Sequence, residues 1–278
     1  SHYQPYTLAL HTSIQETPPQ NQSETIALEF SNQQTAPQNQ SETIALEFNN
    51  QQTTPKNQSE TLALEFSNQQ TSSQNQSETL ALEFILDNEF LRVVVNEETG
   101  DLNSVFDKLN NREILSASGN QLQAFKDEGQ YWDAWNIDPN YAEKCLPPFQ
   151  LKSIEWLDQG LLQQKLRVVR QLGESEFIQD YILQINSQIL KIHTKVNWLE
   201  RHVLVKAAFP LNLEANFATY EIPCGAIQRT TKPTTPAEKA KWEVPALHWA
   251  DLTEEGDAKT IDSYGVSLLN DCKYGYDA

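Results

Sequence analysis

The sequence predicts an all-β protein, an antiparallel β-sandwich preceded by a largely disordered repeat segment. From residue 85 onward, short apolar runs alternate with polar positions, and no segment keeps a 3.6-residue period, so helices should be few. All nine glycines lie at or after Gly100, whereas Gln, Asn, Ser and Thr dominate the first 84 residues. We therefore expect two parts, residues 1–84 and residues 85–278.

The first part contains a tandem repeat. The motif Asn21–Phe30 (NQSETIALEF) returns with only Ile/Leu exchanges at Asn39, Asn57 and Asn75, which gives four copies with a period of 18 residues. Each copy offers one short strand with alternating apolar positions. A β-solenoid is the alternative, but the copies lack the glycines that tight corners use. We expect a mostly disordered insert with some tendency to associate through its strands.

The second part begins with a hairpin and continues as a series of strands. Phe90–Val95 is a β-rich run, residues 96–100 form a turn, and Leu102–Phe106 returns. Further strands are expected at Leu151–Leu157, Leu162–Leu172, Phe177–Asn186, Ile189–Trp198 and Val203–Phe209. Along Ile189–Trp198, apolar side chains share one face and Lys, His and Asn the other, which is typical of a strand with one buried face. A short turn of helix is expected near residues 236–241.

Composition excludes several classes of partner. The formal net charge of −18 disfavours nucleic acid and anionic membranes, and no apolar run approaches the roughly 18 residues that a spanning helix needs. The three cysteines lie far apart without CxxC spacing, which indicates reduced thiols and a cytoplasmic protein. The chain has no methionine and stops at Ala278 within a motif, so we expect a fragment that is cut at both ends.

The densest chemical cluster is Tyr131–Asp138 (YWDAWNID). Sugars stack an apolar face on aromatic rings and offer hydroxyls to carboxylates and amides. Trp132 and Trp135 are therefore candidate stacking walls, and Asp133 is a candidate hydroxyl acceptor. The alternative is that the tryptophans belong to the core. A second polar group, expected at a strand end, is the candidate rim of the same carbohydrate site: Asn270, Asp271 and Lys273.

No catalytic residue or metal ligand can be assigned within this chain. His193 is expected on the solvent-facing, lysine-bearing side of its strand, and His202 and His248 have no partner at metal-ligand spacing. Cys272 has no histidine near it in sequence, which argues against a cysteine nucleophile. The sequence has neither a glycine-rich phosphate loop nor a GxSxG motif.

Four motifs together resemble a known family. In this order they closely resemble the C-terminal part of cytosolic and bacterial α-mannosidases of glycoside hydrolase family 38, from about Leu86 to the end: YWDAWNID at 131–138, YEIPCGAI at 220–227, WEVPALHWADL at 242–252, and LLNDCKYGY at 268–276. The repeat copies are not part of this resemblance. The resemblance implies a galactose-mutarotase-like β-sandwich, truncated at its C-terminus here, that packs on a catalytic α/β barrel of the same polypeptide, which would precede residue 1.

The resemblance also implies a function for the parent protein. Its reaction would be retaining hydrolysis of terminal α-mannosides by two carboxylates, with the zinc ion in the missing barrel and no cofactor in this chain. The chain alone would be inactive, and its partners would be that barrel and a mannose-containing glycan. The alternative is a free-standing carbohydrate-binding or assembly module that has the same sandwich but no catalytic role.

Overall fold

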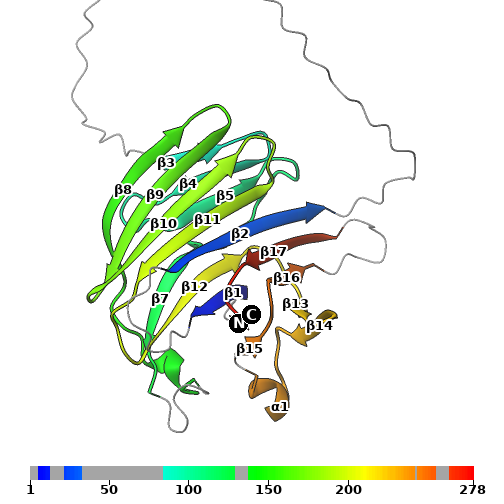
Figure 1. Ribbon diagram of the computed structural model, residues 1–278. Coiled ribbons are helices and arrows are strands. Elements are labelled where there is room, and N and C mark those ends of the chain that lie inside the picture. The colour runs from blue at the N-terminus through cyan, green and yellow to red at the C-terminus, as the bar shows by residue number, and fades with distance from the viewer. Residues whose placement is uncertain (1–5, 13–21, 33–83, 129–136, 242, 255–262) are drawn as a thin grey trace, which may run out of the picture. The chain divides into compact units, whose positions relative to one another are not determined.

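A computed structural model describes residues 6–12, 22–32, 84–128, 137–241, 243–254 and 263–278, with side chains from residue 84 onward. Residues 33–83, which include most of the repeat, lie outside these ranges. Every strand pair in the described part is antiparallel, and its helical elements are the short α1 (Pro236–Lys239) and η1 (Tyr141–Glu143) (Figure 1). The all-β prediction is confirmed.

The strands form three sheets (Figure 1). The five-stranded sheet has the order β15 (Val244–Pro245), β18 (Gly275–Asp277), β1 (Tyr6–Thr12), β12 (Val203–Leu211), β7 (Gln121–Lys126). The nine-stranded sheet has the order β14 (Gly225–Thr230), β13 (Phe217–Ile222), β16 (Trp249–Thr253), β17 (Tyr264–Asn270), β2 (Gln22–Asn32), β11 (Ile189–Asn197), β10 (Ser175–Gln184), β9 (Gln163–Leu172), β8 (Gln150–Gln159). The four-stranded sheet has the order β3 (Phe84–Asp87), β4 (Leu91–Val95), β5 (Leu102–Asp107), β6 (Arg112–Glu113).

Apolar alternation explains the strands that the sequence predicts. The expected hairpin is β4–β5, and the five further predicted strands are β8 to β12. On β11, Leu190, Ile192 and Val196 are buried, whereas Lys195 and Asn197 are exposed, so the predicted two-faced strand is confirmed. One hydrophobic core takes residues from all three sheets. The predicted helical turn is α1, which begins with a capping box between Thr235 and Glu238.

Among the described residues, two strands, β1 and β2, lie before Phe84. β2 is the first repeat copy and pairs with β11 on one side and β17 on the other. β1 pairs with β12 and β18. We expected a mostly disordered segment up to residue 84, and in these two stretches the structure differs, because the neighbouring strands offer them backbone hydrogen bonds on both sides. The other copies (39–48, 57–66 and 75–83) lie outside the described residues, where disorder stays a prediction.

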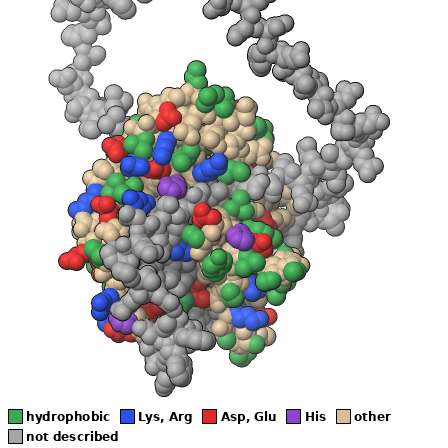
Figure 2. All heavy atoms as spheres, in the orientation of Figure 1, with side chains coloured by type: hydrophobic (Ala, Val, Ile, Leu, Met, Phe, Trp, Pro, Cys, Tyr) green, Lys and Arg blue, Asp and Glu red, His purple; other side chains and the backbone are tan. Residues whose placement is uncertain are grey.

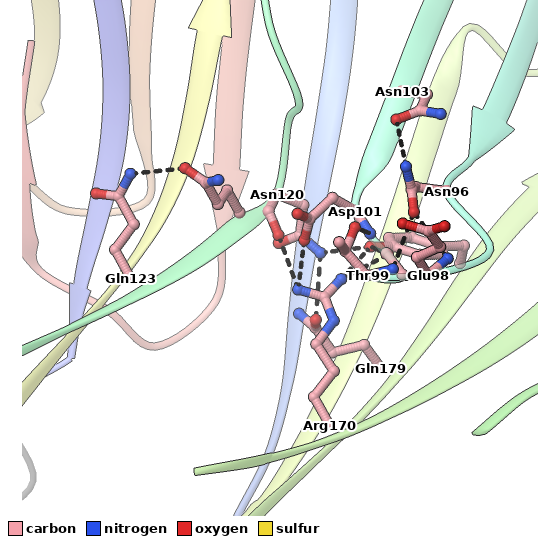
Figure 3. Close-up of polar contacts among 12 residues, drawn as sticks. Asn96, Glu98, Thr99, Asp101, Asn103, Asn120, Gln123, Arg170 and Gln179 are labelled. Atoms are coloured by element: carbon pink, nitrogen blue, oxygen red, sulfur yellow. Dashed lines mark hydrogen bonds and ion pairs between the residues drawn. The ribbon is translucent and has the colours of Figure 1, made fainter. Parts of the chain in front are cut away.

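A buried arginine joins two sheets at the turn between β4 and β5 (Figure 3). Arg170 on β9 is 1% exposed, and its guanidinium pairs with Asp101 at 2.9 Å and donates to the Gly100 carbonyl at 2.5 Å. Tyr181 Oη on β10 donates to the same carbonyl at 2.8 Å. Gly100 has a φ of +76°, and an added Cβ would lie 2.3 Å from Val168 Cγ1, so this turn requires glycine.

Candidate functional site

The aromatic segment (residues 129–136) contains the predicted site residues Trp132, Asp133 and Trp135, and all three lie outside the described residues. The structure does describe both ends of this segment. Asp127 accepts a hydrogen bond on Oδ1 from the backbone N–H of Asp138 at 2.9 Å, and the Asp127 N–H donates to the His202 carbonyl at 2.8 Å. The two ends of the segment are thus held together beside the start of β12.

Asp138 anchors the C-terminal end of that segment. Its side chain is 4% exposed, pairs with Lys144, and accepts from the backbone N–H of Asn140 at 2.9 Å. The hydrogen bond from Lys144, followed by that from Asn140, lowers the pKa of the Asp138 carboxyl. Asp138 therefore stays ionised at neutral pH. Its contacts fix the start of η1, which begins at Tyr141.

Tyr141, the first residue of η1, belongs to a buried polar cluster. Lys206 on β12 is 3% exposed, and its ammonium contacts Tyr141 Oη and Glu243 Oε1 and lies 2.8 Å from Asp277 Oδ2. Tyr141 Oη also lies 3.0 Å from Glu243 Oε1, and the Lys206 ammonium lies 4.4 Å from the centre of the Tyr141 ring. We call these four residues the Lys206 cluster.

Packing explains why the Tyr141 ring lies there. The ring stacks edge-on against Phe125 of β7, with centroids 5.2 Å apart, and shares a small hydrophobic cluster with Leu204. Lys206 lies two residues after Leu204 on β12, where every residue from Leu204 to Leu211 is buried. A lysine in such a strand is stable only if its ammonium finds partners, and Glu243 and Asp277 supply them from just before β15 and from β18.

The charges in the Lys206 cluster do not balance, since one ammonium faces two carboxylates. Burial, and then the charge of Asp277, raises the pKa of Glu243 to about 7. Burial also raises the pKa of Asp277. The Asp277 side chain is 29% exposed and that of Glu243 is 10% exposed. Because water stabilises the more exposed carboxylate, Asp277 keeps its charge and Glu243 takes the proton as the pH falls.

The other two groups in the cluster respond to the same surroundings. Burial raises the pKa of Tyr141 to about 12, so its hydroxyl stays protonated. Burial alone would lower the pKa of Lys206, but the charges of Asp277 and Glu243 outweigh it and raise the pKa. Within the described part of the chain, Glu243 Oε2 and Asp277 Oδ1 are buried without a hydrogen-bond partner. The cluster therefore has acceptor capacity beyond what its own members use.

The predicted polar rim lies in one turn between β17 and β18, and we call residues 270–274 the C-terminal turn. Asn270 is 7% exposed; its carboxamide NH₂ donates to Tyr276 Oη, and its Oδ1 accepts from the backbone N–H groups of Cys272 at 3.0 Å and Lys273 at 2.5 Å. Asp271 is exposed and Lys273 is half-buried. The Asn270 side chain thus shapes the turn, and Asp271 and Lys273 lie on it; a role in sugar binding stays a prediction for all three.

Both predicted regions lead into the Lys206 cluster. Tyr141 lies five residues after the aromatic segment, and Asp277 lies three residues after the C-terminal turn. Both Tyr141 and Asp277 contact the Lys206 ammonium, so the stretches of chain that follow the two regions meet there. The sequence analysis named none of the four residues of the Lys206 cluster as candidates. The available signal was a lone lysine in the apolar run VLVKAAFPL (residues 203–211), where solvent cannot be its partner.

The described residues include no group of three or more His, Cys, Asp or Glu side chains that could hold a metal ion. His248, one of the histidines considered from sequence, lies 3.1 Å from Glu221 and is exposed. Each helix in the described ranges is too short to cross a membrane. On the face drawn in Figure 2, acidic and basic side chains are interspersed.

Comparison with known proteins places the chain in a family. Residues 86–278 match the model of the glycosyl hydrolases family 38 C-terminal domain. The chain belongs to this family. It is 35% identical over 194 residues to alpha-mannosidase 2C1 of Homo sapiens, which covers 68% of this chain and 18% of that protein. It is 34% identical over 204 residues to alpha-mannosidase G of Dictyostelium discoideum, which covers 69% of this chain and 18% of that protein.

The chain thus spans less than a fifth of the length of these relatives. Among solved structures, an alpha-mannosidase from Enterococcus faecalis V583 aligns over 69% of this chain and 29% of that chain, with 11% identity and a TM-score of 0.49. The family resemblance that the sequence motifs predict is confirmed, and the match covers the C-terminal domain of the family.

Proposed function

We propose that the chain is a non-catalytic domain of an enzyme that hydrolyses terminal α-mannosides, and that it helps to form the carbohydrate cleft. The match of residues 86–278 to the family 38 C-terminal domain carries this proposal. In this proposal, Trp132 and Trp135 stack on the sugar, Asp133 accepts its hydroxyls, and the C-terminal turn, with Asn270, Asp271 and Lys273, forms the polar rim. The Lys206 cluster supports it, because Tyr141, which follows the aromatic segment, and Asp277, which follows the C-terminal turn, both contact Lys206.

The catalytic barrel of the same polypeptide is the proposed packing partner, and it is where we propose that the zinc ion is held. The described surface offers apolar area for such a partner. Leu161 and Leu162, in the β8–β9 turn, are 95% and 75% exposed, and Ile185, whose N–H donates to the Leu162 carbonyl, is 47% exposed.

We propose a cytoplasmic enzyme without nucleic-acid or membrane partners, which the three free cysteines and the net charge of −18 support.

Asp133→Asn in the intact protein tests the sugar site. The substitution keeps the shape and one acceptor but weakens charge-assisted hydrogen bonds, so kcat/KM for a nitrophenyl α-mannoside should fall about tenfold to a hundredfold with little change in thermal stability. Glu128→Gln is the matched control, because the Glu128–Lys126 pair is exposed and its loss should leave kcat/KM unchanged. A variant that loses stability but keeps kcat/KM per folded molecule would remove Asp133 from the cleft.

Two further measurements separate the proposal from its alternative. The isolated chain should release no nitrophenol, whereas the intact protein should, because the reacting carboxylates are proposed to lie in the barrel. A chain that binds mannosides by calorimetry without any barrel in its native polypeptide would instead be a free-standing carbohydrate-binding module. Trp132→Ala and Trp135→Ala should weaken substrate affinity if the rings stack on sugar, and should cost about 3–5 kcal/mol of folding free energy if they are core.

A further inference from the structure

The nine-stranded sheet has one position that the repeat fills. β2 lies between β11 and β17, with Ala27 opposite Lys191 on one side and Leu269 on the other. We call this position, between β11 and β17, the slot. Without a strand in the slot, both neighbours would present unpaired backbone N–H and C=O groups inside the sheet. The slot therefore has to be filled for the sheet to be continuous.

The chain carries more than one sequence that suits the slot. β2 reads QSETIALEFSN over residues 22–32. Residues 40–50 read QSETIALEFNN, and residues 58–68 read QSETLALEFSN, so each differs from β2 at one position. The differences are Ser31 against Asn49, and Ile26 against Leu62. The backbone ladder does not depend on these side chains, and an exchange of Ile for Leu is a mild, volume-conserving change.

The fourth copy is different because its last residue, Phe84, belongs to another strand, β3. Residues 76–86 read QSETLALEFIL, and Phe84–Asp87 forms β3, which pairs with β4 in another sheet. The Phe84 ring also packs near Trp156, with centroids 6.4 Å apart. Three copies, residues 22–32, 40–50 and 58–68, thus have a sequence that suits the slot and an end that is not part of another described strand.

β1 supports the idea that one 18-residue unit supplies one strand. Nine residues before the first complete copy recur 18 positions later: Gln4, Thr7, Ala9, Leu10, Ser13, Gln15, Thr17, Pro19 and Gln20. β1 falls within this divergent unit and pairs in the five-stranded sheet, whereas β2, from the next unit, pairs in the nine-stranded sheet. Successive units therefore already fill separate strand positions in this fold.

The lengths of the two connecting loops determine the relative entropic cost of placing each copy in the slot. With residues 22–32 in the slot, the connections to β1 and β3 are 9 and 51 residues; with 40–50 they are 27 and 33, and with 58–68 they are 45 and 15. Loop closure scales with the −3/2 power of length, so the relative weights are about 1, 0.4 and 0.6. A 15-residue connection can span roughly 50 Å, which exceeds the size of a domain of this length.

We propose that the slot between β11 and β17 is filled interchangeably by residues 22–32, 40–50 or 58–68 of the same chain. The folded protein is then a mixture of three arrangements with one sandwich and differently divided loops. The repeat expansion is tolerated because every arrangement completes the sheet. The occupant is the chain's own copy rather than that of a second molecule, because connection to the same polypeptide keeps the local concentration of the copies high.

Disulfide trapping in the intact protein tests this. In a background with Cys145, Cys224 and Cys272 changed to Ser, Lys191→Cys is combined with Ala27→Cys, Ala45→Cys or Ala63→Cys, since these alanines are equivalent positions in the three copies. Directly opposed residues on paired strands can form a disulfide. In a glutathione buffer, the three intramolecular disulfides should form with equilibrium constants within about threefold of one another. Ala36→Cys in a spacer is the control and should form at least about tenfold less.

Proline substitution gives a second, independent readout. A proline in a central strand removes a ladder hydrogen bond. Ala27→Pro alone should lower the folding equilibrium constant only about twofold, because the other two copies take over. Ala27→Pro, Ala45→Pro and Ala63→Pro together should lower it at least about a hundredfold.

Three results would overturn the proposal. The first is an intramolecular disulfide that forms when Lys191→Cys is combined with Ala27→Cys but not when it is combined with Ala45→Cys or Ala63→Cys. The second is an Ala27→Pro variant that is as damaged as the triple proline variant. The third is disulfide formation by Ala45→Cys and Ala63→Cys as covalent dimers, because the occupant of the slot would then come from a second molecule.

Discussion

Glu243→Gln tests the charge state of the Lys206 cluster. The folded protein holds the pKa of Glu243 at about 7, against 4.5 for the free side chain. The carboxylate is thus harder to ionise in the folded than in the unfolded state. The stability that the protonated side chain contributes is fully present below pH 4.5 and is lost as the pH rises through 7. A difference of about 2.5 in pKa corresponds to about 3 kcal/mol of stability lost over this window.

Glutamine reproduces the protonated side chain and cannot ionise. Its carboxamide oxygen can still accept from Lys206 and Tyr141, and Asp277 remains as the counter-ion of Lys206. The free energy of unfolding of Glu243→Gln, minus that of the wild type, should therefore rise by about 3 kcal/mol between about pH 4.5 and pH 8. Urea denaturation at half-unit pH steps measures this difference, because titrations common to both proteins cancel.

A second Glu→Gln change should show the opposite sign. Glu254 pairs with Arg112 at 2.5 Å, and this hydrogen bond lowers the pKa of Glu254. Its stabilisation is present above pH 4.5 and is lost as the pH falls through the lowered pKa, so Glu254→Gln should be less stable than the wild type at about pH 6–8 and approach it in acid. The reasoning about Glu243 is refuted if Glu243→Gln is destabilised at every pH and keeps the wild-type slope, because Glu243 would then be an ionised partner of Lys206.

Three further outcomes are expected. Gly100→Ala should lower the unfolding temperature, since its φ is +76° and its Cβ would meet Val168, whereas Gly225→Ala, with nothing within 4 Å, should not. Arg170→Met should cost about 3–5 kcal/mol in urea denaturation because it leaves Asp101 unpaired and buried, and Asp101→Asn with Arg170→Met should recover part of that loss. Leu161→Ser with Leu162→Ser should loosen barrel packing and speed limited proteolysis of the intact protein, whereas Leu109→Ser, an exposed control at another turn, should not.

Local pattern explains which strands the sequence predicts. β4, β5 and β8 to β11 have apolar alternation that is readable without knowing their partners, and β12 is readable as a continuous apolar run. The repeat is harder, because its strand pattern occurs in four near-identical copies and sequence does not say which one pairs. β2 is stabilised by β11 and β17, whose residues lie more than 150 positions away in sequence. Tertiary pairing therefore decided between strand and disorder at this copy.

The candidate site likewise has one part that the sequence singles out and one part that only the topology brings together. Composition alone singles out the stretch Tyr131–Asp138, because three rings and two carboxylates in eight residues are conspicuous. Glu243 and Lys206 lie in segments that are separated in sequence and meet only through the order β15, β18, β1, β12 in the five-stranded sheet. No spacing rule connects them, so this part of the site required the topology.

The Lys206 cluster connects the stretch of chain after the aromatic segment with the stretch after the C-terminal turn. Tyr141 and Asp277 both contact the Lys206 ammonium, although 136 positions separate them in sequence. A buried ammonium keeps its partners because the cost of leaving it unpaired is several kcal/mol. A change at the C-terminal turn that displaces Asp277 would therefore also alter the charge around Tyr141, which lies five residues after the aromatic segment. If both regions contribute to a carbohydrate cleft, as proposed, the contacts of the buried lysine fix the chain that follows each of them.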